Sequence, residues 1–316
     1  MKRLNDFTPA TLDYFVIQSE CELRSPPART LRIIRAAHLG MCFGVRDAIA
    51  LARGQDGPPL TILGELVHNE TVLAGLRARG IGIETRVEDV TTPTVMITAH
   101  GASDKTLQAL KARGLGVLEA TCPLVHHAHQ AVKSLLRGNF HIVIIGQRDH
   151  VEVRGLTQDL AEFDVVLTEE EALQLAERPR FGVAAQTTQP IDRVRHLVGV
   201  MRRRFPRSEI RFIDTVCQPT KQRQAAAVEM ARQADVVIVV GGAHSNNTRE
   251  LAVTCRRYCP RVHQVADWRD LRADWLTDAE TAGLTAGTST PDAVIDEVEL
   301  RLRALAEGPA IGQQYY

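Results

Sequence analysis

The chain has 316 residues, of which 44% are hydrophobic and 24% charged, enough apolar material for a substantial core in two or more domains. Its 38 Lys and Arg residues balance its 38 Asp and Glu residues, so no net positive field favours nucleic acid as a partner. The longest apolar run, residues 236–240, is far shorter than the roughly 20 residues of a membrane-spanning helix, so no membrane span is expected.

Residues 1–30 carry mixed charges and lack the apolar stretch of a secretion signal. We therefore expect an N-terminal extension on a cytoplasmic protein. Six cysteines are too few for a disulfide scaffold, and free thiols are expected in a reducing compartment.

Along the chain, β-branched runs alternate with helical patterns, which is typical of an α/β protein with mostly parallel sheets. Three times, a predicted strand is followed by a Cys and then by a predicted helix. The three sets are residues 31–37, Cys42 and 45–53; 116–119, Cys122 and 128–136; and 210–216, Cys217 and 223–233.

The cysteines are separated by 80 and 95 residues, which fits one α/β unit for each interval. We expect three similar small units, arranged with pseudo-threefold symmetry around a common centre. The predicted segments are an extension at 1–30, units at 31–121, 122–216 and 217–304, and a C-terminal tail at 305–316.

Two further strands are expected in each unit, and polar residues follow each of them. In open parallel sheets, ligands bind outside the carboxyl ends of the strands, so these residues and the three thiols would line one central cavity. The first polar tip lies 26, 28 and 28 residues after the Cys, and the second 58, 65 and 72 residues after it. The tips are His68 and His100 in the first unit, His150 and Thr187 in the second, and Ser245 and Ser289 in the third.

Three cysteines at equivalent positions suit a metal centre with an open coordination site. A 4Fe-4S cluster held by three thiolates leaves one iron free to bind substrate, and helix N-termini would help keep the sulfurs ionised. The alternative is that these are ordinary buried cysteines. Cys21, Cys255 and Cys259 have no counterparts in the other units, and no function is expected for them.

The remaining tips have the chemistry of an anion site. His68, His100, Ser245, Asn247 and Ser289 could donate hydrogen bonds to a diphosphate. Helix capping is the alternative: Asn247 would begin a capping box, and Ser289 would cap the helix after it. No nucleotide-binding glycine motif is present, so a nucleotide is not expected.

Glu152 is the only carboxylate placed at such a tip beside a His. Burial near a cluster would raise its pKa and make it a proton donor, with Thr187 orienting the group that is protonated. The alternative is an acid on a loop that faces solvent.

At this point the sequence resembles the 4-hydroxy-3-methylbut-2-enyl diphosphate reductase family, over about residues 40–303. Seven segments in the same order carry the resemblance: Cys42-Phe43-Gly44-Val45, Val67-His68-Asn69, Ala99-His100-Gly101, Ala120-Thr121-Cys122-Pro123-Leu124-Val125, Gln186-Thr187-Thr188, Ser245-Asn246-Asn247-Thr248 and Thr285-Ala286-Gly287-Thr288-Ser289-Thr290-Pro291-Asp292.

The resemblance implies reductive dehydroxylation of that substrate to isopentenyl and dimethylallyl diphosphate, in non-mevalonate isoprenoid biosynthesis, with ferredoxin or flavodoxin as electron donor. It implies a 4Fe-4S cluster on Cys42, Cys122 and Cys217. The implied catalytic residues are Glu152, His150 and Thr187, and the implied substrate-binding residues are His68, His100, His150, Thr187, Ser245, Asn246, Asn247 and Ser289.

Two alternatives stay open. Val151 stands between His150 and Glu152 where family members often have Pro, so a diverged paralogue acting on another allylic diphosphate is one alternative. A non-catalytic iron–sulfur sensor is the other. A sensor needs neither a buried acid nor a set of diphosphate donors, so the presence of both favours an enzyme.

Overall fold

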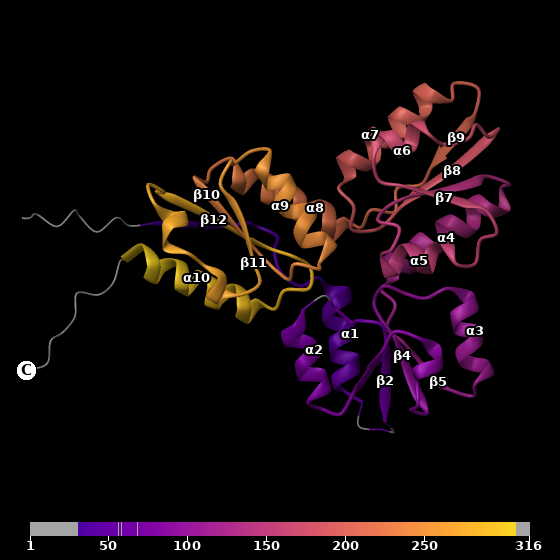
Figure 1. Cartoon of the computed structure of the whole chain (residues 1–316), viewed down its shortest axis with the longest axis horizontal. Coiled ribbons are helices and arrows are strands. Elements are labelled where there is room, and N and C mark those ends of the chain that lie inside the picture. The colour runs from indigo at the N-terminus through magenta and orange to yellow at the C-terminus, as the bar shows by residue number, and fades with distance from the viewer. Residues whose placement is uncertain (1–30, 56, 58, 68, 308–316) are drawn as a thin grey trace, which may run out of the picture.

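The computed structural model describes residues 31–55, 57, 59–67 and 69–307. The chain forms three four-stranded sheets, and every strand pairing within them is parallel. Figure 1 shows three lobes, one around each sheet, that meet at the centre of the molecule. The predicted α/β class with three similar units is confirmed.

The first sheet has the strand order β3-β2-β4-β5. Its buried centre comes from apolar strand residues such as Ile62 and Met96. The elements of this unit are α1 (Phe43–Arg53), β2 (Leu60–Leu63), α2 (Glu70–Arg77), β3 (Gly82–Glu84), a 3-10 helix (Val87–Asp89), β4 (Thr94–Ile97), α3 (Asp104–Ala112) and β5 (Gly116–Glu119).

The second sheet repeats this order as β7-β6-β8-β9. Its two central strands, β6 and β8, are almost wholly buried, as expected for parallel strands covered by helices on both faces. The elements are α4 (Pro123–Arg137), β6 (His141–Ile145), α5 (Val151–Thr157), β7 (Phe163–Val166), α6 (Glu169–Leu173), β8 (Arg180–Ala185), α7 (Ile191–Arg204) and β9 (Glu209–Phe212).

The third sheet has the order β11-β10-β12-β1, and its last strand comes from the start of the described chain. The side chains of β10 alternate between two apolar cores, because successive residues of a strand face opposite sides of the sheet. The elements are α8 (Gln218–Ala231), β10 (Val236–Val240), α9 (Asn246–Arg256), β11 (Val262–Val265), two 3-10 helices (Trp268–Asp270 and Ala273–Leu276), β12 (Thr281–Ala286), α10 (Asp292–Glu307) and β1 (Arg32–Arg35).

The position of β1 corrects the predicted limits of the first unit. The strand was expected in unit 31–121, but Arg32 to Arg35 pair with Thr281 to Leu284 of β12. The physical reason is the repeat itself: in the other two units, the strand before the Cys is the edge strand of the preceding sheet. β5 and β9 occupy that edge in the first and second sheets, and β1 occupies it in the third.

The opposite edge strands, β3, β7 and β11, were not predicted from the sequence. β3, β7 and β11 are only three or four residues long, and most of their residues are partly exposed, so their apolar pattern is weak. Within the described ranges, no helix is both long and apolar enough to cross a membrane.

Candidate active site

The three expected cysteines occupy equivalent places in the fold. Cys42, Cys122 and Cys217 are the N-cap residues of α1, α4 and α8. Each donates its backbone N–H to a carbonyl just beyond the neighbouring strand, over 3.4 Å to Thr288, 3.0 Å to Ala99 and 3.0 Å to Thr187 respectively. None uses its sulfur as the helix-capping acceptor, although Sγ of Cys217 lies 3.0 Å from the hydroxyl of Thr220 in the first turn of α8.

Contacts of these cysteines place them around one region. A Cβ added at Gly44 would lie 2.6 Å from the Sγ of Cys122, so this sulfur packs against the first turn of α1, next to Cys42. The negative charges of Cys42 and Glu152 both act on Cys122 and on Cys217. In the part of the chain that the structure describes, no three His, Cys, Asp or Glu side chains are close enough to hold a single metal ion.

Burial is the main cause that raises the pKa of Cys122, and it raises the pKa of Cys217 to about 11. Backbone hydrogen bonds at the two helix N-termini lower both pKa values, as predicted, but desolvation outweighs them. Bound metal would supply the positive charge that a thiolate needs here.

Arg223, for which no role was predicted, is a buried cation beside Cys42 and Cys217. Its guanidinium donates to the carbonyl of Gly40 from Nε (3.0 Å) and Nη2 (2.6 Å), and to the carbonyl of Pro219. Burial lowers its pKa, while the charges of Cys42 and Cys217 raise it. The side chain thus fixes both cysteine loops and adds positive charge next to two of the thiols.

Glu152 is buried on the first turn of α5, with 1% of its surface exposed, so the alternative of a solvent-facing loop acid is wrong. Thr187 holds both carboxyl oxygens: its N–H donates to Oε1 over 2.7 Å and its hydroxyl to Oε2 over 3.0 Å. Burial raises the pKa of Glu152 to about 7, although these two hydrogen bonds oppose the rise. At neutral pH the group can therefore both hold and release a proton.

His150 and His100 bring the first and second units together. His150 is the N-cap of α5, and its Nδ1 accepts from the N–H of Glu152 over 3.2 Å. The His100 ring meets the His150 ring edge to face, with 5.7 Å between ring centroids. His68, the remaining predicted histidine, lies outside the described residues.

Helix capping accounts for Ser245 but not for the other polar residues at the strand tips of the third unit. Ser245, not Asn247, caps α9 and accepts from the N–H of Thr248, so the predicted capping box at Asn247 is wrong. Ser289 is buried, and its hydroxyl has no partner among the described residues, so it does not cap the following helix. The side-chain nitrogens of Asn246 and Asn247 are likewise buried without a described partner.

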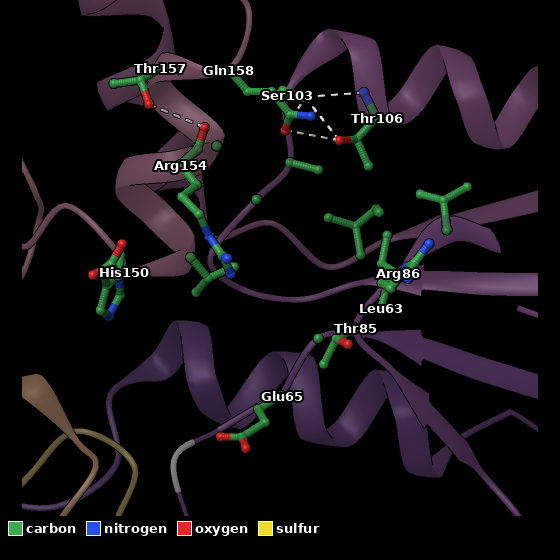
Figure 2. A pocket seen from close by; sticks show the side chains of 18 of the residues that line it. Leu63, Glu65, Thr85, Arg86, Ser103, Thr106, His150, Arg154, Thr157 and Gln158 are labelled. Atoms are coloured by element: carbon green, nitrogen blue, oxygen red, sulfur yellow. Dashed lines mark hydrogen bonds between the residues drawn. The ribbon is translucent and has the colours of Figure 1, made fainter. Parts of the chain in front are cut away.

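A cavity of about 760 Å³ opens next to these tips. Residues of all three units line it, including Gly101, His150 and Arg249. In Figure 2, His150 stands at one side of the cavity and the side chain of Arg154 extends toward its middle. Of the predicted site residues in the described ranges, His150 alone lines this cavity.

Three parallel α/β units carry N-cap cysteines, a buried carboxyl and buried polar groups without described partners at the ends of their strands, and these features define a class: an α/β protein with the groups of an enzyme site. The family model described as LytB protein matches residues 33–303. The chain belongs to the LytB family, as its seven motifs predicted.

Curated relatives carry the same enzyme name. A 4-hydroxy-3-methylbut-2-enyl diphosphate reductase from Geobacter metallireducens is 34% identical over 279 residues, which covers 87% of this chain and 98% of the relative. The reductase of the same name from Aquifex aeolicus is 33% identical, over 88% of this chain and 98% of the relative.

Two solved structures are also similar. One is described as (E)-4-hydroxy-3-methyl-but-2-enyl diphosphate reductase, the terminal enzyme of the non-mevalonate pathway, with a TM-score of 0.61, 33% identity, and coverage of 87% of this chain and 99% of that chain. The other is E-1-hydroxy-2-methyl-but-2-enyl-4-diphosphate reductase from Plasmodium falciparum, with a TM-score of 0.80, 26% identity and 89% of both chains covered. The similarity thus extends over nearly the whole described chain.

Proposed function

We propose that this protein reduces 4-hydroxy-3-methylbut-2-enyl diphosphate to isopentenyl and dimethylallyl diphosphate. In this reaction the allylic C–O bond breaks, two electrons and two protons enter, and the hydroxyl leaves as water. The observation that carries the proposal is the meeting of three N-cap cysteines with the Thr187-bound carboxyl of Glu152, in a chain of the LytB family.

The cofactor we propose is a 4Fe-4S cluster ligated by Cys42, Cys122 and Cys217. The donor set fits this group, because none of the three sulfurs is used as a helix cap, the charge of Cys42 acts on both Cys122 and Cys217, and the Arg223 cation lies beside Cys42 and Cys217. When bound, such a cluster supplies electrons and one iron with an open coordination position. The protein would supply the shape of the site, the protons and the anion-binding groups.

The proton delivered to the departing hydroxyl would come from Glu152. Thr187 holds this carboxyl by both oxygens, and a pKa of about 7 leaves a large protonated fraction at neutral pH. His150 adjoins the same turn of α5 and reaches the cavity, so we assign it to substrate binding and to the proton path.

The diphosphate would be held by His68, His100, Ser245, Asn247 and Ser289, with Asn246 beside them. Buried amide and hydroxyl donors without partners are costly, and an anionic oxygen that accepts from them would remove that cost. The orphaned groups of Asn246, Asn247 and Ser289 lie on the third unit, and His100 lies on the first, against the His150 ring of the second.

We further propose ferredoxin or flavodoxin as the electron donor and the cytoplasm as the place of action. Cys42, Cys122 and Cys217 are free and partly exposed, as ligands of a cluster that exchanges electrons with a partner would be. Free thiols persist in reducing compartments.

The direct test is anaerobic turnover. Cluster-replete protein is mixed with 4-hydroxy-3-methylbut-2-enyl diphosphate and a chemically reduced mediator, and the products are identified. We expect both five-carbon diphosphates. In Glu152→Gln, turnover should fall at least about 100-fold because the proton donor is lost, while the cluster absorbance stays unchanged.

Exposed Glu70→Gln is the control and should turn over like the wild type. Cluster-replete wild type that yields neither product would contradict the proposed reaction, and a paralogue with another allylic diphosphate or a sensor would then be favoured.

A further inference from the structure

One ion pair joins the second and third units near the candidate site. Nη1 of Arg193, on α7, lies 2.7 Å from Oε1 of Glu250, on α9. The two side chains are only 23% and 14% exposed, whereas most ion pairs among the described residues lie at the surface. The second carboxyl oxygen, Oε2 of Glu250, is buried and has no described partner.

From Arg193 the contacts continue to the loop that carries Thr187. The same Nη1 donates to Oε1 of Gln189 over 3.1 Å, and Nε2 of Gln189 donates to Oε1 of Gln186 over 3.1 Å. Gln186 and Gln189 are fully buried. This series of hydrogen bonds ends at Gln186, which directly precedes Thr187, the residue that holds the carboxyl of Glu152.

At its other end, the pair is attached to the helix that carries the orphaned amides. Glu250 lies one turn beyond Asn246 and Asn247 on α9. A second link runs parallel to the first: Nη2 of Arg249 donates to Oε1 of Gln147, whose N–H donates to Oε1 of Gln186. Both links therefore connect the first turns of α9 with the same buried glutamine.

We propose that Arg193 and Glu250 form a positioning pair that sets the diphosphate-binding turn of α9 against the Thr187 loop. This inference rests on the proposed function, and it adds two residues that touch neither substrate nor cluster. The second and third units are separate sheets, so contacts between them set the distance between the donors on one and the carboxyl on the other. The backbone hydrogen bond from Cys217 to Thr187 holds α8, and the positioning pair holds α9.

Loss of one partner should misplace α9. A half-buried charge left unpaired moves toward water, and the helix that bears it shifts with it. The contact between Glu152 and Thr187 lies wholly within the second unit and should survive. We therefore expect weaker substrate binding with little change in the chemical step.

The test uses the holoenzyme with a chemical reductant and compares wild type, Arg193→Gln, Glu250→Gln and the double variant Arg193→Gln/Glu250→Gln. Each single variant should raise KM about tenfold and weaken the affinity for inorganic diphosphate, measured by calorimetry, by a similar factor, with kcat changed by less than about threefold. The double variant should raise KM no further than either single variant, because the two side chains act as one pair. The change in KM without a change in kcat separates positioning from a general loss of structure.

Arg303→Gln is the matched control, because it removes the exposed ion pair to Glu299 on α10 and should leave KM unchanged. If the double variant fails to fold, Arg193→Lys takes its place, with a KM expected between those of wild type and Arg193→Gln. Single variants with a KM within about twofold of wild type, or a folded double variant whose KM rises by the product of the two single effects, would overturn the proposal.

The experiment distinguishes a failure of the proposed function from a failure of this inference. Wild-type holoenzyme that binds inorganic diphosphate without turning over the substrate would contradict the reaction, and the pair would then be judged by diphosphate affinity, with the same expectation. Wild type that binds no diphosphate would overturn the inference as well.

Discussion

The carboxyl of Glu152 shows how burial sets the chemistry of a single residue. Its removal from water favours the neutral form, and Thr187 holds both oxygens so that the group keeps one orientation. The sequence placed this acid beside His150 at a strand tip, which was enough to predict a proton donor. Its burial depends on packing between units, which no local pattern reports.

The raised pKa of Glu152 predicts a specific pH dependence of stability. Folding moves this pKa from its usual 4.5 to about 7, so the folded protein holds the proton more tightly than the unfolded chain. The stabilisation is complete below about pH 4.5 and is lost as the pH rises through about 7. From pH 4.5 to 8, the free energy of unfolding of wild type should fall relative to that of Glu152→Gln by about 3 kcal/mol.

Urea denaturation of both proteins without cluster, followed by circular dichroism at each pH, measures this difference. Equal pH dependence of the two proteins would show that Glu152 titrates near its usual pKa and would contradict its assignment as the proton donor.

At the scale of the element, the same arrangement recurs at the N-termini of α1, α4 and α8, where a Cys is the N-cap residue. Pro123 and Pro219 stand in the first turns of α4 and α8, where a missing N–H costs nothing. The sequence predicted a Cys between strand and helix three times, but it placed each helix start two to five residues too late. The Cys is itself the N-cap, and Cys is not a residue that ordinarily signals a cap.

At position 44, in the first turn of α1, the close approach of a cysteine sulfur requires glycine. A side chain there would press on the sulfur of Cys122, 2.6 Å from the added Cβ, and would displace it. Gly44→Ala should therefore weaken cluster binding by about tenfold, measured as iron retained against a chelator. The helix itself should tolerate Ala, because the backbone at Gly44 is not in the left-handed region.

Gly75→Ala is the matched control, since it lies within α2 and nothing lies within 4 Å of the added Cβ. It should retain iron like the wild type and stabilise the protein by about 0.5–1 kcal/mol. Equal iron retention in Gly44→Ala and wild type would contradict the close packing of Cys122 against α1.

At the scale of the whole molecule, three copies of one unit form a closed set. Each sheet is completed by the strand that precedes the Cys of the next unit, and β1 completes the third sheet from the start of the described chain. Spacing along the sequence predicted three units and their common centre, because each Cys recurs at the same structural junction. It could not predict that the first strand joins the last sheet, since pairing of residues 249 positions apart leaves no local signal.

Contacts between units were equally invisible in the sequence. Arg193 and Glu250 have ordinary places on the faces of two helices, and only the fold brings them together. Arg223 was expected only as the first residue of a helix, and its contact with the carbonyl of Gly40 came from the structure alone.

The measurement that tests the central claim most directly is anaerobic iron and sulfide analysis of wild type and of Cys42→Ser, Cys122→Ser and Cys217→Ser. We expect about four iron and four sulfide per chain in the wild type, and loss of most of both in every single variant, because all three units would hold one cluster. A variant that retained the full cluster would contradict a common three-cysteine site.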